Sequence, residues 1–351
     1  MAEALRIGIM GCGFWSQFQL AGWKELPGVE IAAVWNRTRD RAARIAERFA
    51  VPTVHASAEA LVRDPSVDVV DIITDTTTHA HYVRLAADAG KPVICQKPLA
   101  GDVETARQMA SRCADAGVPL LVHENFRWQT PIRALHAAMQ SGAIGRIFRA
   151  RIDFINGFPV FDNQPFLRDA EKFILADLGT HLLDVARFLF GECSSLFCDT
   201  AQTRTDIRGE NVASLQMRLA RARHDSDVIV QCNMSYAGNP YEHHRFPQTL
   251  AFVEGEQGTI ELTHDYWLHT TTREGTTSRR HPPPVYPWAD PDYAVVHASI
   301  VPCLENLRAA LQGGAPAETT AEDNLKTLEL VDAAYWSAEH RRAWTPGREM
   351  S

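Results

Sequence analysis

A glycine-rich turn near the N-terminus, at residues 11–16 (GCGFWS), has the spacing of a dinucleotide-binding loop. Gly11 would permit a tight turn, and Gly13 would let the backbone approach a pyrophosphate at a helix N-terminus. Ser16 stands at the third glycine position, so the motif alone also fits an ordinary strand-to-helix turn. Its context, between an apolar run and a helical pattern, favours NAD or NADP binding. We expect contacts to the dinucleotide from Gly11, Gly13, Phe14 and Trp15.

The end of the second apolar run bears on the choice of dinucleotide. NAD-specific proteins usually carry Asp or Glu there for the ribose hydroxyls, whereas this chain has Asn36 and Arg37. Asn36 could hydrogen-bond a ribose hydroxyl, and the guanidinium of Arg37 could pair with a 2′-phosphate. These residues mildly favour NADP. The alternative is that Arg37 and Arg39 only solvate the start of the next helix.

Lys97 follows a further apolar run, in the segment Cys95-Gln96-Lys97-Pro98-Leu99. Open α/β sheets bind ligands at the carboxyl ends of their strands, so this lysine is expected at a ligand site. Most lysines are solvated surface charges, but Lys97 emerges from an apolar strand and is fixed by the following proline. We therefore expect Lys97 to take part in the reaction.

Two stretches of the sequence with different hydrophobic patterns are expected to form the sheets that position these residues. Residues 5–122 alternate short β-branched runs with amphipathic helical patterns, which predicts a doubly wound parallel sheet, that is, a Rossmann domain over 1–125. After residue 145 longer strands of alternating polarity follow, which predicts an open, mainly antiparallel sheet in a second domain over 126–351. The expected parallel strands are 5–10, 29–35, 67–74, 92–96 and 119–125. The expected later elements are strands at 146–155, 211–220, 226–236 and 248–262 and helices at about 177–190, 299–312 and 321–340.

Composition excludes several classes of function. The net charge of −8 without a basic run argues against nucleic-acid binding. No apolar stretch approaches the roughly 20 residues of a membrane span, and the N-terminus lacks a signal-peptide pattern, so we expect a soluble, cytoplasmic protein. The seven cysteines form no CxxC pair, which indicates reduced thiols rather than zinc. The stretch Tyr241-Glu242-His243-His244-Arg245 lacks a third spaced ligand, so no metal site is expected.

Several motifs together resemble the glucose-fructose oxidoreductase and inositol dehydrogenase family, called Gfo/Idh/MocA. They are the glycine-rich turn, DIITDTTTHAH (71–81), QKP (96–98), HENFRW (123–128) and DLGTHLLD (177–184), so the resemblance extends over most of the chain. The family's hallmark is a Glu-Lys-Pro turn, which the chain matches with one change. The resemblance implies a Rossmann domain followed by an antiparallel sheet that binds substrate and forms a homodimer or homotetramer. It also allows the C-terminal helix to pack back on the Rossmann domain.

Carried over residue by residue, the resemblance implies that Lys97, Asp177 and His181 are catalytic. Asp177 and His181 are four residues apart, which places both on one face of a helix. His181 would accept a hydroxyl proton while a hydride leaves the same carbon for the nicotinamide, and Lys97 would stabilise negative charge on the oxygen. Asp177 would hold another sugar hydroxyl or orient the other two side chains. The alternative for His181 is a buried histidine without a chemical role, and Asp184 would bond only a neighbouring group.

Further site residues follow from the same resemblance. Thr74, His79, Gln96, Lys97 and Asn125 are expected to contact the cofactor, and Asn125 and Arg127 to contact the substrate as well. Arg127 could instead form an interdomain ion pair. Gln96 replaces the family's usual glutamate and removes a negative charge beside Lys97. Asp75 stands where many relatives have proline, asparagine or a small residue, which changes the local ribose and phosphate contacts.

The function implied is that of an NAD(P)-dependent dehydrogenase in carbohydrate metabolism. The resemblance implies oxidation of a monosaccharide hydroxyl, such as conversion of an aldose, for example apiose, to its lactone. A cyclic polyol of the inositol type is the near alternative. A redox-inactive sensor that binds dinucleotide is an alternative of another class, but it would not need a lysine, an acid and a base together. A non-redox lyase or hydrolase that uses bound NAD transiently would turn over without net NADH.

Overall fold

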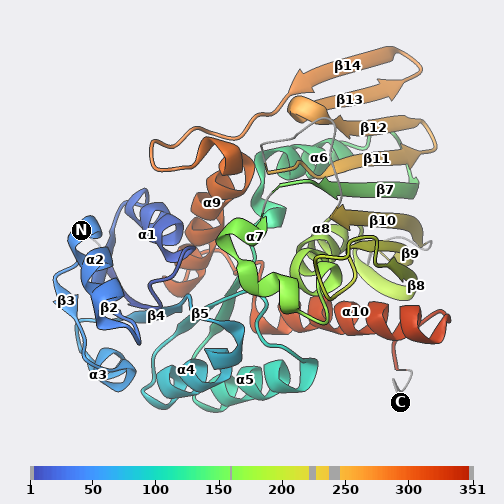
Figure 1. The fold of residues 1–351 in the computed structure, drawn as a ribbon. Coiled ribbons are helices and arrows are strands. Elements are labelled where there is room, and N and C mark those ends of the chain that lie inside the picture. Colours follow the sequence, from blue (N-terminus) through green and yellow to red (C-terminus); the bar gives the residue numbers. More distant parts are fainter. Residues whose placement is uncertain (1–3, 159, 221–226, 237–245, 348–351) are drawn as a thin grey trace. The chain divides into compact units, whose positions relative to one another are not determined.

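The computed structural model describes residues 4–158, 160–220, 227–236 and 246–347. The chain forms two compact units. Unit 1 comprises residues 1–124 and 300–328, and unit 2 comprises residues 125–299 and 329–351. The chain passes from unit 1 to unit 2 just after β6 (Leu120–His123), between residues 124 and 125. The other two boundaries fall within helices α9 (Ala294–Leu311) and α10 (Ala321–His340), which Figure 1 shows toward the red end of the colour scale. Among the described residues, no helix combines the length and the apolar composition that a membrane span requires.

Unit 1 is built on a parallel sheet with the strand order β3-β2-β1-β4-β5-β6, which Figure 1 draws in blue to blue-green. This is the Rossmann order, and it confirms the predicted doubly wound sheet. All residues of β4, β5 and β6 are buried, as expected for parallel strands with helices on both faces. The strands are β1 (Leu5–Met10), β2 (Val29–Trp35), β3 (Thr53–Val54), β4 (Val69–Ile72), β5 (Val93–Gln96) and β6 (Leu120–His123). We did not predict β3, because two residues show no periodicity.

The helices of unit 1 begin at polar residues that suit a helix N-terminus. Ser57, Asp75 and Asp102 accept hydrogen bonds from backbone N–H groups in the first turns of α3, α4 and α5. The carbonyl of Thr319 accepts from the N–H of Val122 at 2.8 Å, so a segment from near the C-terminus pairs with β6. The helices are α1 (Ser16–Lys24), α2 (Arg39–Phe49), α3 (Ala58–Arg63), α4 (Thr76–Asp88) and α5 (Val103–Asp115).

Unit 2 contains a sheet of order β14-β13-β12-β11-β7-β10-β9-β8. Only β10 and β7 are parallel among these described pairs, which confirms the mainly antiparallel sheet. The strands are β7 (Ile147–Asn156), β8 (Glu192–Ala201), β9 (Val212–Ala220), β10 (Val228–Tyr236), β11 (Leu250–Gly255), β12 (Gly258–Thr263), β13 (Trp267–Thr272) and β14 (Gly275–Arg280). We did not predict β8, β13 and β14. All residues of β14 are exposed, so no alternation of apolar and polar residues marks it.

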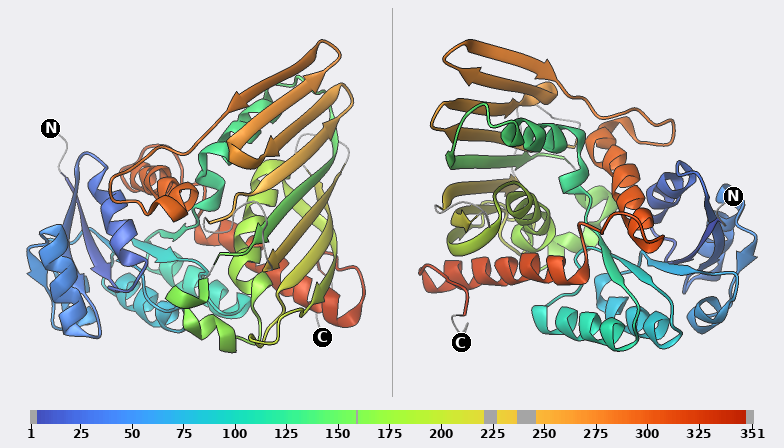
Figure 2. Two further views of the ribbon diagram at one scale, coloured as in Figure 1. Left: turned by 45° about the horizontal axis from the view of Figure 1, so that its top comes forward. Right: turned by 180° about the vertical axis from the view of Figure 1, so that it is seen from behind.

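Helices α6 (Thr130–Gln140) and α8 (Thr180–Phe190) pack on the eight-stranded sheet of unit 2 (Figure 2). Pro131 at the start of α6 suits a helix N-terminus, where its missing N–H is not needed. Every residue of α8 except Phe188 is buried, so this helix belongs to the core of the unit. Short helical turns complete the unit at Phe126–Trp128 (η1), Val160–Asn163 (α7), Pro165–Asp169 (η2), His264–Tyr266 (η4) and Pro291–Tyr293 (η5).

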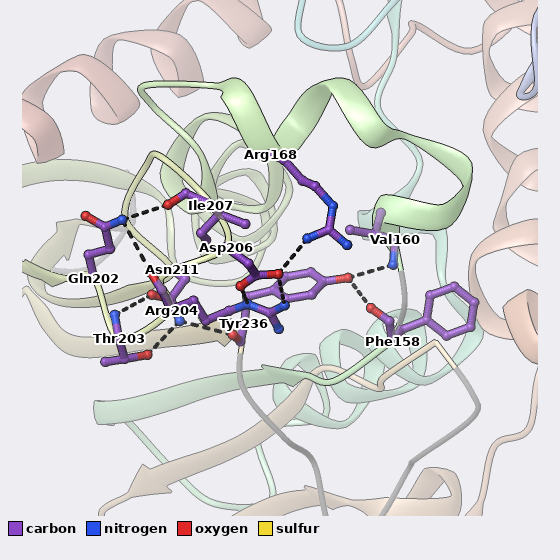
Figure 3. A network of polar contacts seen from close by, with 10 residues as sticks. All are labelled: Phe158, Val160, Arg168, Gln202, Thr203, Arg204, Asp206, Ile207, Asn211 and Tyr236. Carbon is purple, nitrogen blue, oxygen red and sulfur yellow. Dashed lines mark hydrogen bonds and ion pairs between the residues drawn. The ribbon is translucent and has the colours of Figure 1, made fainter.

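A polar network joins the loops beside β9 and β10 (Figure 3). Asn211 accepts from the backbone N–H of Thr203 at 2.7 Å and donates to the carbonyl of Tyr236 at 3.1 Å. The hydroxyl of Tyr236 accepts from the N–H of Val160 at 2.9 Å and donates to the carbonyl of Phe158. Since Tyr236 is 2% exposed, its hydroxyl fixes the chain on either side of residue 159 from within the core.

Replacing Tyr236 with Phe should therefore destabilise unit 2. The change leaves a buried N–H and a buried carbonyl without their partner, which typically costs about 1–3 kcal/mol. We expect a lower urea midpoint with little change in the slope of the unfolding transition, measured by circular dichroism. Tyr82→Phe is a matched control, because the hydroxyl of this half-buried tyrosine forms no hydrogen bond to any described residue. Equal midpoints for the two variants would contradict the structural role of the Tyr236 hydroxyl.

Candidate active site

The backbone at Gly11 passes very close to the end of β4. Gly11 has φ +105°, a conformation that L side chains rarely adopt, and its N–H donates to the carbonyl of Trp35 at 2.9 Å. A Cβ atom at this position would lie 2.3 Å from the carbonyl oxygen of Ile73. Only glycine is compatible with this turn, which lies where the strand order of the sheet reverses between β1 and β4.

Gly13 differs from Gly11, because the chain itself gives no reason for a glycine there. It is exposed, its φ lies outside the left-handed region, and an added Cβ would meet no atom within 4 Å. The following helix, α1, has no side-chain cap and no acidic residue in its first turn. An open backbone at an uncapped helix N-terminus suits a phosphate group, so this turn fits the pyrophosphate of a dinucleotide.

Asn36 holds the glycine-rich turn in place. Its Oδ1 accepts from the N–H of Cys12 at 3.0 Å, and its Nδ2 donates to the carbonyl of Thr38 at 2.9 Å. Arg37 is exposed, and its charge contributes to lowering the pKa of Asp75, after the larger effect of the Thr77 hydroxyl. The environment of Arg37 therefore includes a carboxylate.

His79 joins the Lys97 turn to the end of β4. The Lys97–Pro98 peptide is cis, and Nδ1 of His79 lies 3.1 Å from the carbonyl oxygens of both Pro98 and Leu99. Its Nε2 lies 3.2 Å from the carbonyl oxygen of Thr74. Burial lowers the pKa of His79, so the imidazole is neutral and donates from one nitrogen at a time. These contacts position the turn, and the predicted cofactor contacts of His79 and Thr74 stay predictions.

Gln96 belongs to a buried polar network that the sequence did not reveal. Its Oε1 accepts from the N–H of Lys97 at 3.2 Å, and its Nε2 donates to Gln19 Oε1 and lies 3.1 Å from His123 Nδ1. Gln19 in turn donates to both carboxylate oxygens of Asp71, at 2.9 and 2.8 Å. Burial raises the pKa of Asp71 to about 7. The one signal in the sequence was an acidic residue within the apolar run that became β4.

In unit 2, Asp177 lies on a π-helical turn, Leu175–Gly179, that leads directly into α8. We predicted one regular helix over 177–190, whereas the first turn is wider. The carboxylate of Glu210 accepts from the backbone N–H groups of Phe173 and Leu175, the latter at 3.1 Å. It also accepts from the hydroxyl of Tyr335 at 2.7 Å. These contacts satisfy N–H groups at the start of the turn, and π-helical turns are frequent at functional sites.

His181 is held against an aromatic ring. Its imidazole stacks on Phe126 with 3.8 Å between the ring centroids and 8° between the planes, and the residue is 5% exposed. Asp177 is half-buried, and its charge adds to the effect of burial in raising the pKa of Tyr236. The stacking fixes the plane of the imidazole. A general base needs such a fixed orientation, because its nitrogen must lie within hydrogen-bond reach of the proton that it accepts.

Arg127 forms a buried ion pair with Asp184 one turn along α8 from His181. Its Nε donates to Asp184 Oδ2 at 2.8 Å and a second nitrogen donates to Oδ1, so the pair is bidentate. Both residues belong to unit 2, so this ion pair lies within one unit. Asn125 donates to Ser299 Oγ at 2.9 Å and to the carbonyl of Val296 at 3.2 Å. The predicted substrate contacts of Arg127 and Asn125 stay predictions.

The predicted site residues thus form two groups. One lies at the carboxyl ends of the strands in unit 1 and comprises Gly11, Gly13, Phe14, Trp15, Asn36, Arg37, Thr74, His79, Gln96 and Lys97. The other belongs to unit 2 and comprises Asn125, Arg127, Asp177 and His181. No group of three or more potential metal ligands occurs among the residues that the structure describes. The stretch Tyr241–Arg245 lies outside those residues.

Replacing Gly13 with Ala should weaken NAD binding without destabilising the fold. The methyl group meets no protein atom, but it would occupy the space in which a phosphate approaches the backbone. We expect an unchanged melting temperature and a dissociation constant raised about tenfold or more, equivalent to ~1.4 kcal/mol. Calorimetric titration with NAD measures the second quantity. Gly101→Ala is a matched control, since a Cβ there also meets nothing within 4 Å; equal affinities in both variants would argue against a pyrophosphate at this turn.

Comparison with known proteins agrees with this geometry. A family model described as an oxidoreductase family with an NAD-binding Rossmann fold matches residues 5–124, and a Gfo/Idh/MocA C-terminal domain model matches residues 132–261. The chain is 40% identical to a D-apiose dehydrogenase of Paraburkholderia graminis, over 95% of this chain and 88% of that protein. It is 38% identical to a D-apiose dehydrogenase of Rhizobium rhizogenes, over 96% of each chain.

One solved structure is similar to this chain over almost the whole length of both proteins. It is an oxidoreductase from Agrobacterium radiobacter in complex with NAD+, L-tartaric acid and magnesium, with a TM-score of 0.92 and 38% identity over 97% of this chain and 98% of that chain. The predicted fold and the predicted class of NAD(P)-dependent oxidoreductase are confirmed by these matches. With a family model matched in each half and relatives aligned almost from end to end, the chain belongs to the Gfo/Idh/MocA family of NAD-binding oxidoreductases.

Proposed function

We propose that this protein is an NAD-dependent sugar dehydrogenase that oxidises a hydroxyl group of an aldose, with D-apiose as the leading candidate and a lactone as the product. The observation that carries this proposal is the identity of 40% and 38% to two D-apiose dehydrogenases over nearly the whole chain. We assign cofactor binding to residues 1–125 and substrate binding to residues 126–351. The lysine, the carboxylate and the imidazole of Lys97, Asp177 and His181 are the polar groups that such an oxidation needs.

Each of three side chains has a role in the proposed reaction. The nicotinamide, when bound, supplies the acceptor for a hydride from the carbon that bears the hydroxyl. His181 takes the hydroxyl proton, and its stacking on Phe126 keeps the imidazole aimed in one direction. Lys97 stabilises the negative charge that develops on the oxygen as the proton leaves. Asp177 accepts a hydrogen bond from a second hydroxyl of the sugar.

The proposal extends to NADP as a second cofactor. The side chain of Asn36 is already hydrogen-bonded to Cys12 and Thr38, and positions 36–39 directly after β2 contain no acidic residue to repel a 2′-phosphate. The exposed guanidinium of Arg37 is suited to such a phosphate, but the nearby Asp75 carboxylate partly offsets its charge. The sequence favoured NADP, and that preference stays a prediction. Because Asp75 weakens the case for Arg37 and the similar solved structure contains NAD+, we propose that NAD is used and that NADP is accepted less well.

We also propose that the protein forms a homodimer or homotetramer through the sheet of unit 2. Ile155 on β7, Phe197 on β8 and Trp267 on β13 are 44%, 41% and 39% exposed. Each occupies an outward-facing position of its strand, where a second copy of the sheet would bury it.

An absorbance assay for reduced nicotinamide tests the proposed function. We expect NADH to form with D-apiose, and to form more slowly or not at all with other aldoses and with inositols. A signal with inositols alone would instead establish a cyclic polyol dehydrogenase. Measurable NAD binding without turnover of any sugar would favour a sensor, and turnover without net NADH would favour a lyase or hydrolase. The same assay with NADP tests the role of Arg37, since no activity with NADP would contradict it.

Replacing His181 with Ala should lower kcat by about 10²–10⁴-fold, the usual contribution of a positioned general base. NAD affinity should stay unchanged, because the proposed role of His181 is confined to the substrate hydroxyl. His340→Ala is the control, since this histidine is exposed on the last turn of α10. Retained turnover in the His181 variant, with wild-type stability, would remove His181 from the mechanism.

A further inference from the structure

A chain of hydrogen bonds leads from the backbone of Lys97 to a fully buried carboxylate. The N–H of Lys97 donates to Gln96 Oε1, Gln96 Nε2 donates to Gln19 Oε1, and Gln19 Nε2 donates to both oxygens of Asp71. Trp23 Nε1 donates to Asp71 Oδ2 at 2.8 Å. Asp71 is 0% exposed and has no role in the reaction proposed above.

The hydrogen bonds from Lys97 to Asp71 all run in a single direction, because an ionised carboxylate can only accept hydrogen bonds. Asp71 requires the NH2 group of Gln19 to face it, which turns Gln19 Oε1 toward Gln96. Gln96 must then present its own NH2 group to Gln19, which turns Gln96 Oε1 toward the N–H of Lys97. An amide side chain alone has no preferred end, so the orientation of both amides is decided at Asp71.

We propose that Asp71 is a positioning residue for Lys97, whose carboxylate orders the Gln19 and Gln96 amides and thereby fixes the backbone of the lysine turn. The inference rests on the role of Lys97 in the proposed function. Asp71 does not touch substrate or cofactor in this scheme. It acts through two amide groups: the Asp71–Gln19 and Gln19–Gln96 hydrogen bonds are buried, and the bond from the Lys97 N–H to Gln96 is partly buried.

Protonation of Asp71 reverses this order. A proton on Oδ1 makes a donor that faces Gln19 Nε2, 2.9 Å away, and the conflict is relieved when Gln19 turns its oxygen toward Asp71. Gln96 turns in response and presents its NH2 group to the N–H of Lys97, so the hydrogen bond to Lys97 is lost. Because burial raises the pKa of Asp71 to about 7, the ordered arrangement is present above this pH and is lost as the pH falls through it.

The other polar and titratable groups beside these hydrogen bonds are compatible with a negative charge on Asp71. Helix α1 contributes Gln19 and the indole N–H of Trp23, which both donate. Strand β5 contributes Cys95, whose pKa burial raises well above its usual value, so that it stays a neutral thiol. Strand β6 contributes His123, whose Nδ1 faces Gln96 Nε2 and accepts in the ordered arrangement.

The same reasoning explains how glutamine can stand where the family's turn has glutamate. A glutamate at position 96 would itself be an acceptor-only group beside the N–H of Lys97. In this protein the acceptor-only group is Asp71 on β4, and the amides of Gln19 and Gln96 transmit its effect to the N–H of Lys97. Moving the carboxylate from one end of the chain of amides to the other should therefore preserve the order and only reverse its direction.

A double-mutant cycle tests this inference. Asp71→Asn should lower kcat/KM about ten- to a hundredfold, mainly through kcat, as expected for one charge-assisted hydrogen bond. Gln96→Glu alone places acceptor-only groups at both ends of Gln19 and should lower kcat/KM as well. The double variant should recover most of the wild-type value of kcat/KM. Additive losses in the double variant would overturn the inference.

A measurement without substrate separates this inference from the proposed function. The chain has five lysines, so 15N-lysine labelling yields few backbone amide signals, and Lys97→Arg identifies that of Lys97. Between about pH 5 and about pH 9, the Lys97 amide shift should titrate in the wild-type apoprotein and not in the folded Asp71→Asn variant. The exposed Lys24 provides the control signal. A Lys97 signal that stays constant in the wild type would overturn the inference, even if the enzyme oxidises a sugar.

Discussion

The close contact between the backbone at Gly11 and the carbonyl of Ile73 is the constraint on which the cofactor half of the site depends. Any Cβ atom at Gly11 would collide with that carbonyl, so the turn after β1 can lie against the end of β4 only as glycine. This contact lies where the strand order reverses, and that position is where doubly wound sheets bind ligands. Asn36 then ties the turn to the end of β2. The open backbone at Gly13 and the uncapped start of α1 come directly after this turn in the sequence.

The residues proposed to act on the substrate depend on a different kind of support. Asp177 and His181 lie at the junction of a π-helical turn and α8, and the position of that turn is set by Glu210 and Tyr335 from distant parts of the sequence. A π-helical turn spaces side chains differently from an α-helix, so their relative directions depend on this junction. The stacking of His181 on Phe126 limits the imidazole further.

The buried charge of Asp71 lowers the free energy of unfolding, and a residue retained in spite of this loss is expected to have a function. Its pKa in the folded protein is about 7, above the value of about 3.9 for an unfolded aspartate. Between these values the folded state binds the proton more tightly than the unfolded state does, so the free energy of unfolding falls as the pH rises. At neutral and higher pH the buried charge therefore destabilises the fold, unlike a hydrophobic residue at the same position of β4. The hydrogen bonds of Gln19 and Trp23 offset only part of this cost.

The sequence alone determined the doubly wound sheet, the antiparallel sheet after it, the glycine-rich turn and the family. Each of these leaves a local signature, namely periodicity along a strand or helix, or a short motif. Tertiary structure alone decided that Arg127 pairs with Asp184, that the start of the predicted helix is π-helical, and that Gln19, Asp71 and Gln96 form one chain. These contacts join residues that are 52 to 77 positions apart, as in the Gln19–Asp71 and Gln19–Gln96 pairs. Periodicity in the sequence specifies which face of an element is buried, but not which polar groups meet inside, because that depends on how separate elements pack.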